Sequence, residues 1–144
     1  MNLYAESSAV LSWLLGEPDG VRVLDCLVAA DTVVASELTL VECDRVLIRA
    51  VLMKTLSETA AADRRAELYA GSALWHIFGI GHEVLDRARQ PFPEEPVRTS
   101  GALHLATAVL ARSAVPGIQV LSLDEKLRAS ARRLGFRLLP GSSV

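Results

Sequence analysis

The amino-acid sequence predicts a three-layer α/β/α fold with a parallel central sheet. Short runs rich in β-branched residues alternate with segments whose apolar residues recur every three or four positions, as in an amphipathic helix. A strand, a crossover helix and another strand build a parallel sheet that is covered by helices on both faces. The 144 residues contain no repeat, low-complexity tract or long linker, so we expect a single domain over residues 1–144.

The first third of the chain is expected to hold two strands and three helices. Serine is a favoured helix N-cap, because its hydroxyl accepts from a free backbone N–H of the first turn. Glycine often follows the last helical residue, because it adopts the left-handed conformation at little cost. The expected elements are a strand over 3–5, a helix from Ser7 or Ser8 to Gly16, a helix over 21–30, a strand over 32–35 and a helix from Ser36 to about residue 54.

The remaining elements follow from the same signals. Residues 74–80 are the most strand-like segment of the middle of the chain, and Gly135 stands where a helix C-terminus would need a glycine. The expected elements are a helix from Ser57 to about residue 73, a strand over 74–80, a helix over 82–90, a loop over 91–96, a helix over 99–112, a strand over 118–123, a helix over 124–134 and a strand over 136–139.

The composition excludes some classes of protein. Hydrophobic residues make up 51% of the chain and aromatic residues 5%, which indicates a folded core of Leu, Val and Ala. The formal net charge of −2 gives no general basic footprint for nucleic acid. A local arginine patch stays open, because Lys54 and Lys126 are the only lysines and arginine binds phosphate well.

The cysteines and the apolar segments predict a soluble cytoplasmic protein. Cys26 and Cys43 are isolated, with no CxxC pattern, so we expect reduced thiols. The N-terminus has no basic segment ahead of its apolar run, which argues against a signal peptide. Residues 68–81 contain no Asp, Glu, Lys or Arg but are shorter than the roughly 18–20 residues of a membrane span, so no membrane association is expected.

Three carboxylates are predicted to lie near the carboxyl ends of the strands. Glu6 follows the first expected strand, Asp124 follows the strand over 118–123, and Glu42 lies in the helix after the second strand. Ligands of open parallel sheets bind at this edge, and converging carboxylates suit a hard cation. Each residue also has a structural interpretation: Asp124 as a helix N-cap, Glu42 as a solvated helix residue, and Glu6 as a first-turn acid favoured by the helix dipole.

Four segments together resemble the PIN-domain family, especially its bacterial VapC-type toxins. They are YAESSAVLSWLLGEP, SELTLVECDRVL, VRTSGALHLATAVL and VLSLDEKLRASARRLGF, which occur in the family's order and spacing from residue 3 to the last strand. The resemblance implies a PIN-like fold and a metal-dependent endoribonuclease, the toxin of a toxin–antitoxin pair. It also implies an acidic site at the edge of a parallel sheet that binds Mg²⁺ or Mn²⁺.

The resemblance assigns the acids by position. Glu6 stands at the family's first acid, which is normally aspartate, Glu42 at the second and Asp124 at the fourth. We therefore expect these three residues to be the metal ligands and the catalytic residues, with their carboxylates within about 10 Å of one another. The extra methylene of Glu6 would displace a bound ion, and Mg²⁺ tolerates such errors in geometry poorly.

The third acid of the family falls on Gly101, so one carboxylate is missing. Ser8 is expected to support the site through a hydrogen bond or water, and Arg98 to hold phosphate or to brace the site electrostatically. Thr99, Ser100, Glu94 and Glu95 lie nearby in the sequence, but no spacing argument selects one of them as a replacement. His104 is expected to pack or to form a hydrogen bond on one face of its helix.

Two functions follow from the missing acid. The first is a VapC-like endoribonuclease whose activity is weakened or abolished by Gly101, with RNA as substrate, a VapB-type antitoxin as partner and a homodimer as the assembly that the resemblance implies. The alternative is a catalytically inactive PIN domain that acts only by binding an antitoxin or RNA. Position 101 separates the two.

Overall fold

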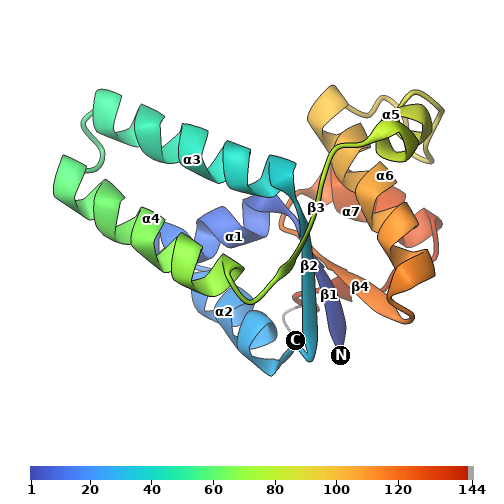
Figure 1. Ribbon diagram of the computed structural model, residues 1–144, viewed down its shortest axis with the longest axis horizontal. Coiled ribbons are helices and arrows are strands. Elements are labelled where there is room, and N and C mark those ends of the chain that lie inside the picture. The colour runs from blue at the N-terminus through green and yellow to red at the C-terminus, as the bar shows by residue number, and fades with distance from the viewer. Residues whose placement is uncertain (143–144) are drawn as a thin grey trace.

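The computed structural model describes residues 1–142, which form five strands and seven helices in alternation (Figure 1). The first half contains β1 (Asn2–Ala5), α1 (Ser7–Leu14), α2 (Gly20–Ala29), β2 (Thr32–Ser36), α3 (Glu37–Leu52) and α4 (Glu58–Ser72). The second half contains β3 (His76–Phe78), α5 (His82–Ala88), α6 (Thr99–Ala114), β4 (Ile118–Leu121), α7 (Glu125–Arg133) and β5 (Leu138–Leu139).

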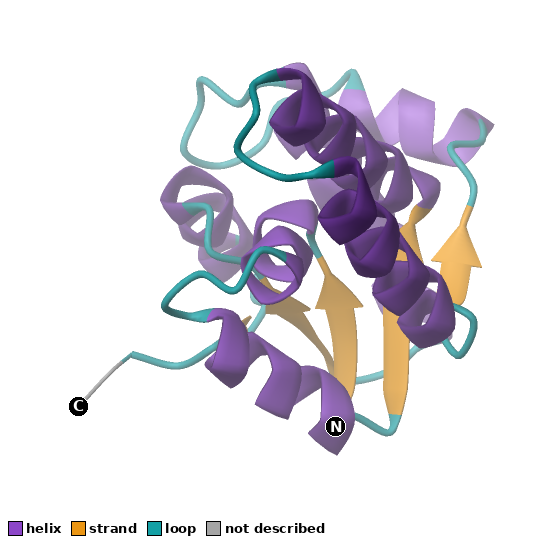
Figure 2. Cartoon of the chain, turned by 90° about the vertical axis from the view of Figure 1, so that its left-hand side faces the viewer, coloured by secondary structure: helices purple, strands orange, loops and turns teal. Residues whose placement is uncertain are grey.

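The sheet is parallel throughout, which confirms the predicted fold class. Its strand order is β3-β2-β1-β4-β5, and Leu3 of β1 pairs with Val33 on one side and Gln119 on the other. The carboxyl ends of all five strands therefore lie at one edge of the sheet, and the arrowheads that are clearly visible in Figure 2 point toward it. The chain order reverses between β1 and β4, and a crevice opens at such a switch point, outside the carboxyl ends of the strands.

Side chains of the strands alternate between two cores. Leu3 and Ala5 face the helices α1 to α4, whereas Tyr4 between them packs with α5, α6 and α7. The two groups of helices lie on opposite sides of the sheet in Figure 1. At its carboxyl edge the two groups meet, because α3 contacts α6 and the Ser7 hydroxyl of α1 lies 3.1 Å from His104 Nε2 of α6. This contact brings residues of both layers to the place where the acids were expected.

Most predicted helix boundaries agree with the structure, but one cap and the bounds of three strands were wrong. The strands expected over 118–123 and 136–139 are limited to Ile118–Leu121 and Leu138–Leu139. Ser36 and Ser57 cap their helices, as predicted, and Gly135 follows α7 with φ +92°. The cap of α1 is Glu6, whose side chain accepts from the backbone N–H of Ser8, so both serines lie inside the helix. The strand expected over 74–80 is limited to His76–Phe78, because only these residues pair with the neighbouring β2.

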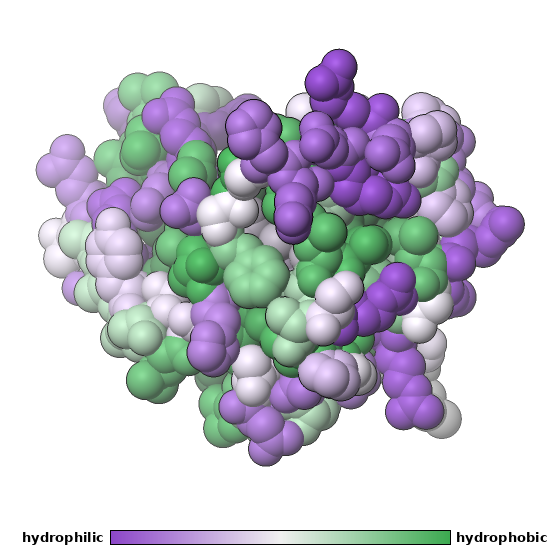
Figure 3. Space-filling model, turned by 45° about the vertical axis from the view of Figure 1, so that its right-hand side comes forward, coloured by the Kyte–Doolittle hydropathy of each residue, from purple (hydrophilic) through white to green (hydrophobic). Residues whose placement is uncertain are grey.

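Hydrophilic and hydrophobic side chains are unevenly distributed over the face shown in Figure 3. The hydrophilic ones gather at the top and upper right of the view, and the hydrophobic ones cross its middle. Within residues 1–142, no helix is long and apolar enough to span a membrane.

Candidate acidic site at the carboxyl edge of the sheet

Two of the predicted acids, Glu6 and Glu42, meet at the carboxyl edge of the sheet. Glu6 directly follows β1, and Glu42 lies in the second turn of α3, which begins where β2 ends. The buried Thr39 hydroxyl fixes α3 at this place by donating to the carbonyl oxygen of Ala5, at 3.0 Å. The Ser7 hydroxyl then lies between the two acids, 3.1 Å from Glu6 Oε1 and 2.9 Å from Glu42 Oε1.

Glu6 is buried and surrounded by hydrogen-bond donors. Only 5% of the residue is exposed. Its Oε1 accepts from the backbone N–H of Ser8 at 3.1 Å, in addition to the shared Ser7 hydroxyl. Its Oε2 accepts from the Ser8 hydroxyl and, at 2.7 Å, from the Ser122 hydroxyl. Ser8, expected as a supporting residue, thus contacts Glu6 through both its backbone and its side chain.

Glu42 is half-buried and bound on one side only. Its Oε1 lies 2.5 Å from His104 Nε2 and accepts from Ser7. Burial acts to raise the pKa of Glu42, but the hydrogen bond and the charge of His104, together with Ser7, outweigh it and lower that pKa below its usual value. Among the described residues, none donates to Glu42 Oε2. This oxygen is therefore available to a ligand.

His104 connects the acids to the opposite layer of the fold. The side chain is almost fully buried, and its Nδ1 lies 2.8 Å from the Tyr4 hydroxyl. Burial first, and then the charge of Glu6, raise the pKa of Tyr4 well above its usual value, so the phenol keeps its proton and can donate it. His104 Nε2 thus faces the Glu42 carboxylate, and Nδ1 forms a hydrogen bond with the Tyr4 hydroxyl.

The sequence did not reveal that Tyr4 and Ser122 belong to this network. The pattern predicted Tyr4 to be an ordinary core residue of the first strand, and Ser122 to be the residue before the last in the strand over 118–123. The usable signal was that both are polar groups at the carboxyl ends of strands. Hydrogen-bond capacity in such a position calls for a partner, although the sequence does not say which one.

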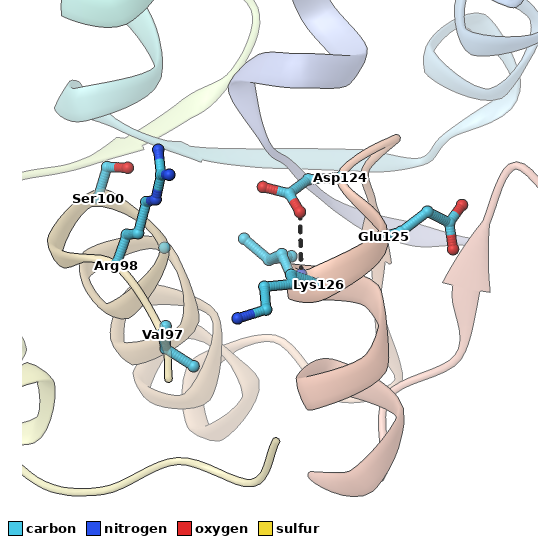
Figure 4. A pocket seen from close by; sticks show the side chains of 8 residues that line it. Val97, Arg98, Ser100, Asp124, Glu125 and Lys126 are labelled. Carbon is cyan, nitrogen blue, oxygen red and sulfur yellow. Dashed lines mark hydrogen bonds between the residues drawn. The ribbon is translucent and has the colours of Figure 1, made fainter. Parts of the chain in front are cut away.

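Asp124 faces a different part of the edge. Its Oδ1 caps α7 by accepting from the backbone N–H of Leu127 at 3.1 Å, so its structural interpretation is correct. The side chain lines a pocket of about 620 Å³ between the starts of α6 and α7, together with Arg98, Ser100 and Gly101. In Figure 4, Asp124 and Arg98 point toward the same space. Neither Glu6 nor Glu42 lines this pocket.

A backbone contact links Asp124 to the other acids. Its N–H donates to the Ser122 hydroxyl at 3.1 Å, and Ser122 in turn donates to Glu6. The position of the Asp124 carboxylate therefore depends on the loop after β4.

Neither Glu94 nor Glu95 replaces the carboxylate that is missing at Gly101. Glu94 pairs with Arg133, and Glu95 accepts from the backbone N–H groups of Phe92 and Val97 within its own loop. Neither lines the pocket. A Cβ built on Gly101 would lie 3.3 Å from Cγ1 of Val97, so a side chain at this position requires only a small shift.

The residues present do not fit a divalent metal ion as they are arranged. A carboxylate offers about four lone-pair positions; three of those of Glu6 accept from Ser8 and Ser122, and the fourth shares the single Ser7 proton with Glu42. Free oxygens remain on Glu42 and Asp124 alone among the three acids. Burial raises the pKa of the adjacent Cys43 thiol to about 12, so this thiol stays protonated in the absence of a metal. Across residues 1–142, no three His, Cys, Asp or Glu side chains are grouped so as to hold a metal.

Comparison with solved structures shows the same fold in several toxins. The chain is similar to the sarcin–ricin loop cleaving toxin VapC20 of Mycobacterium tuberculosis, with 15% identity, coverage of 88% of this chain and 93% of that chain, and a TM-score of 0.63. It is similar to a toxin–antitoxin complex from Klebsiella pneumoniae, with 17% identity, coverage of 100% and 97%, and a TM-score of 0.61.

A third similar structure is VapBC2 of Rickettsia felis bound to a DNA fragment from its promoter, with 12% identity, coverage of 96% and 97%, and a TM-score of 0.64. No curated protein sequence matches the chain significantly. The family model of the PIN domain, however, matches residues 3–133, which include all three acids and Gly101. The chain therefore belongs to the PIN domain family.

Proposed function

We propose that this protein is a VapC-type toxin of the ribonuclease class whose acidic site is incomplete in the present sequence. The observation that carries the proposal is the position of Gly101. It lies across the pocket from Asp124, beside the switch point of a parallel sheet. It also stands where the family resemblance places a third acid. The expected consequence is RNA cleavage that is weak or absent until a carboxylate is restored at residue 101.

The family generally uses a divalent metal, and Mg²⁺ or Mn²⁺ is the ion proposed for the restored site. Such an ion supplies activation of water for attack on a phosphodiester and stabilisation of the leaving oxygen. Glu42 and Asp124 are the proposed acids of the catalytic site, because each retains an oxygen without a donor. Arg98 is the proposed phosphate-binding residue, since it extends into the same pocket. Ser8 supports the site by holding Glu6.

The proposed partners are RNA and a VapB-type antitoxin, with a homodimer as the assembly. Support for the antitoxin comes from the two similar folds that were solved as toxin–antitoxin assemblies. A cytoplasmic location is part of the same proposal and agrees with the free thiols of Cys26 and Cys43.

The test is cleavage of a structured RNA by the parent and by Gly101→Asp, each with Mn²⁺, with Mg²⁺ and with EDTA. We expect at least a tenfold increase in metal-dependent cleavage in Gly101→Asp. Gly101→Asn is the matched control, because it adds nearly the same volume without a charge. Equal rates in the aspartate and asparagine variants would contradict the proposal.

A second candidate is a PIN domain that acts by binding alone. The observation that favours it is the filled hydrogen-bonding capacity of Glu6, which leaves fewer than three free acids at the edge. This function predicts that Gly101→Asp cleaves no RNA even when Glu6→Asp is added, while both variants still bind the antitoxin peptide or RNA as the parent does.

A further inference from the structure

We infer that Glu6 is a positioning residue that fastens the loop after β4 to the start of α1, and that it is not a free ligand at the acidic site. The inference rests on the proposed function only in that it concerns the same site. Glu6 was expected to be a metal ligand, both from its position at the carboxyl edge of the sheet and from the family resemblance, and the inference gives it a structural role instead.

The first argument is the number of donors around the carboxylate. Three groups donate to Glu6 without an alternative carboxylate acceptor within reach: the Ser8 N–H, the Ser8 hydroxyl and the Ser122 hydroxyl. The single proton of Ser7 is shared with Glu42. A metal ion at Glu6 would have to displace one of the two serine hydroxyls, which would exchange its bond to a carboxylate for the longer contact of 3.3 Å with the other serine.

The second argument is that the hydroxyls of Ser8 and Ser122 also accept hydrogen bonds from the backbone of the loop after β4. Ser8 Oγ accepts from the backbone N–H of Leu123 at 2.9 Å, and Ser122 Oγ accepts from that of Asp124 at 3.1 Å. Two successive backbone N–H groups are thus connected, each through one hydroxyl, to the same oxygen of Glu6. The Glu6 backbone adds a third tie, because its N–H donates to Leu121 at 3.0 Å.

Together these bonds hold the whole turn between β4 and α7. That turn carries Asp124, whose carboxylate faces the pocket beside Gly101. Glu6 therefore sets the place of an acid in the neighbouring pocket without entering that pocket itself.

The third argument is the length of the side chain. Glutamate is not among the favoured N-cap residues, yet here it caps α1 and also reaches Ser122. Aspartate is shorter by one methylene, about 1.5 Å, so it could not make both contacts from the same backbone position. The departure from the family's usual aspartate is explained by this bridging role.

The two roles predict opposite signs for the effect of Glu6→Gln on stability without metal. As a ligand among converging acids, Glu6 would repel Glu42, so removing its charge would raise the Tm in EDTA. As a positioning residue, it loses acceptors for buried hydroxyls, so we expect the Tm in EDTA to fall by about 5 °C or more. Glu125→Gln is the control, since that acid is exposed and should change the Tm by less than about 2 °C.

Amide hydrogen exchange distinguishes positioning from a general loss of stability. In Glu6→Gln we expect exchange at Leu123 and Asp124 to accelerate at least tenfold more than at Val34, in the middle of the sheet. Ser8→Ala and Ser122→Ala retain the carboxylate and should free the same amides, so they serve if Glu6→Gln does not fold. A rise in Tm, or exchange at the two amides that changes only as much as at Val34, would overturn the inference. Failure of Gly101→Asp to cleave RNA would refute the proposed function and leave this result untouched.

Discussion

The hydrogen bond between Tyr4 and His104 is predicted to be a main tie between the acidic site and the core. The two residues are 100 positions apart in the sequence, and the bond of 2.8 Å is buried. Tyr4→Phe keeps the aromatic ring and removes one hydroxyl, which leaves Nδ1 of His104 without a partner. We expect a loss of about 1–2 kcal/mol in the free energy of unfolding.

His104→Leu should cost more, because it removes every contact of the imidazole. The Tyr4 hydroxyl would be buried without its partner at His104. Glu42 would lose its contact of 2.5 Å with His104 Nε2. Glu6 Oε1, which lies 4.0 Å from the same nitrogen, would also lose the imidazole that separates the two carboxylates. Breaking a buried contact of this kind costs about 3–5 kcal/mol. For a chain of this length that corresponds to a decrease in Tm of about 10 °C or more.

A double-mutant cycle measures the interaction itself. Once His104 is leucine, the buried Tyr4 hydroxyl has lost this partner, so Tyr4→Phe should no longer destabilise the protein in that background. The coupling energy is then about 1–2 kcal/mol. Urea unfolding followed by circular dichroism gives the four free energies.

The matched control is Tyr69→Phe. Tyr69 is exposed, whereas Tyr4 is fully buried, and no hydrogen bond of the network involves it. Its effect should be within about 0.5 kcal/mol and additive with His104→Leu. A coupling energy below about 0.5 kcal/mol for Tyr4 and His104 would refute the reasoning, because the buried contact would then carry no energy of its own.

Three further predictions concern single positions. In Gly101→Asp, 10 mM Mn²⁺ should raise the Tm by about 3 °C or more, because an ion that binds only the folded state stabilises it. The shift should be less than about 1 °C in the parent and in Gly101→Asn, and equal shifts in all three proteins would contradict a restored site. The lowered pKa of Glu42 contributes stability that is present above its usual value of 4.5 and is lost as the pH falls through the lower folded-state pKa. Glu42→Gln should therefore flatten the acid side of a Tm profile between pH 3 and 6 in EDTA, and an unchanged slope would exclude this residue as its source. Gly135 has φ +92°, so Gly135→Ala should lower the Tm by about 3–6 °C. Gly141→Ala is the control and should leave the Tm unchanged, because a Cβ at Gly141 meets open space. A decrease of equal size in both variants would show that backbone strain is not the cause.

The fold could be predicted from the sequence because its signals are local. Period-two and period-3.6 patterns, together with caps such as Ser36 and Ser57, depend on residues within a few positions of one another. The same holds for Gly135, which marks the end of α7. Alternation of strands and helices then leaves few topologies other than a parallel sheet, and a parallel sheet directs attention to its carboxyl edge.

Tertiary structure alone decided the role of each acid. The sequence places Glu6, Glu42 and Asp124 at the same edge, but hydrogen bonds from α1 and the loop after β4 fill Glu6, while Glu42 and Asp124 each keep a free oxygen. The partnership of Tyr4 with His104 likewise depends on β1 and α6 lying against each other. The physical reason is that a hydrogen bond forms only over a range of about 0.5 Å in donor–acceptor distance. The donors around these acids come from several elements, and no pattern along one segment of the chain encodes their distances.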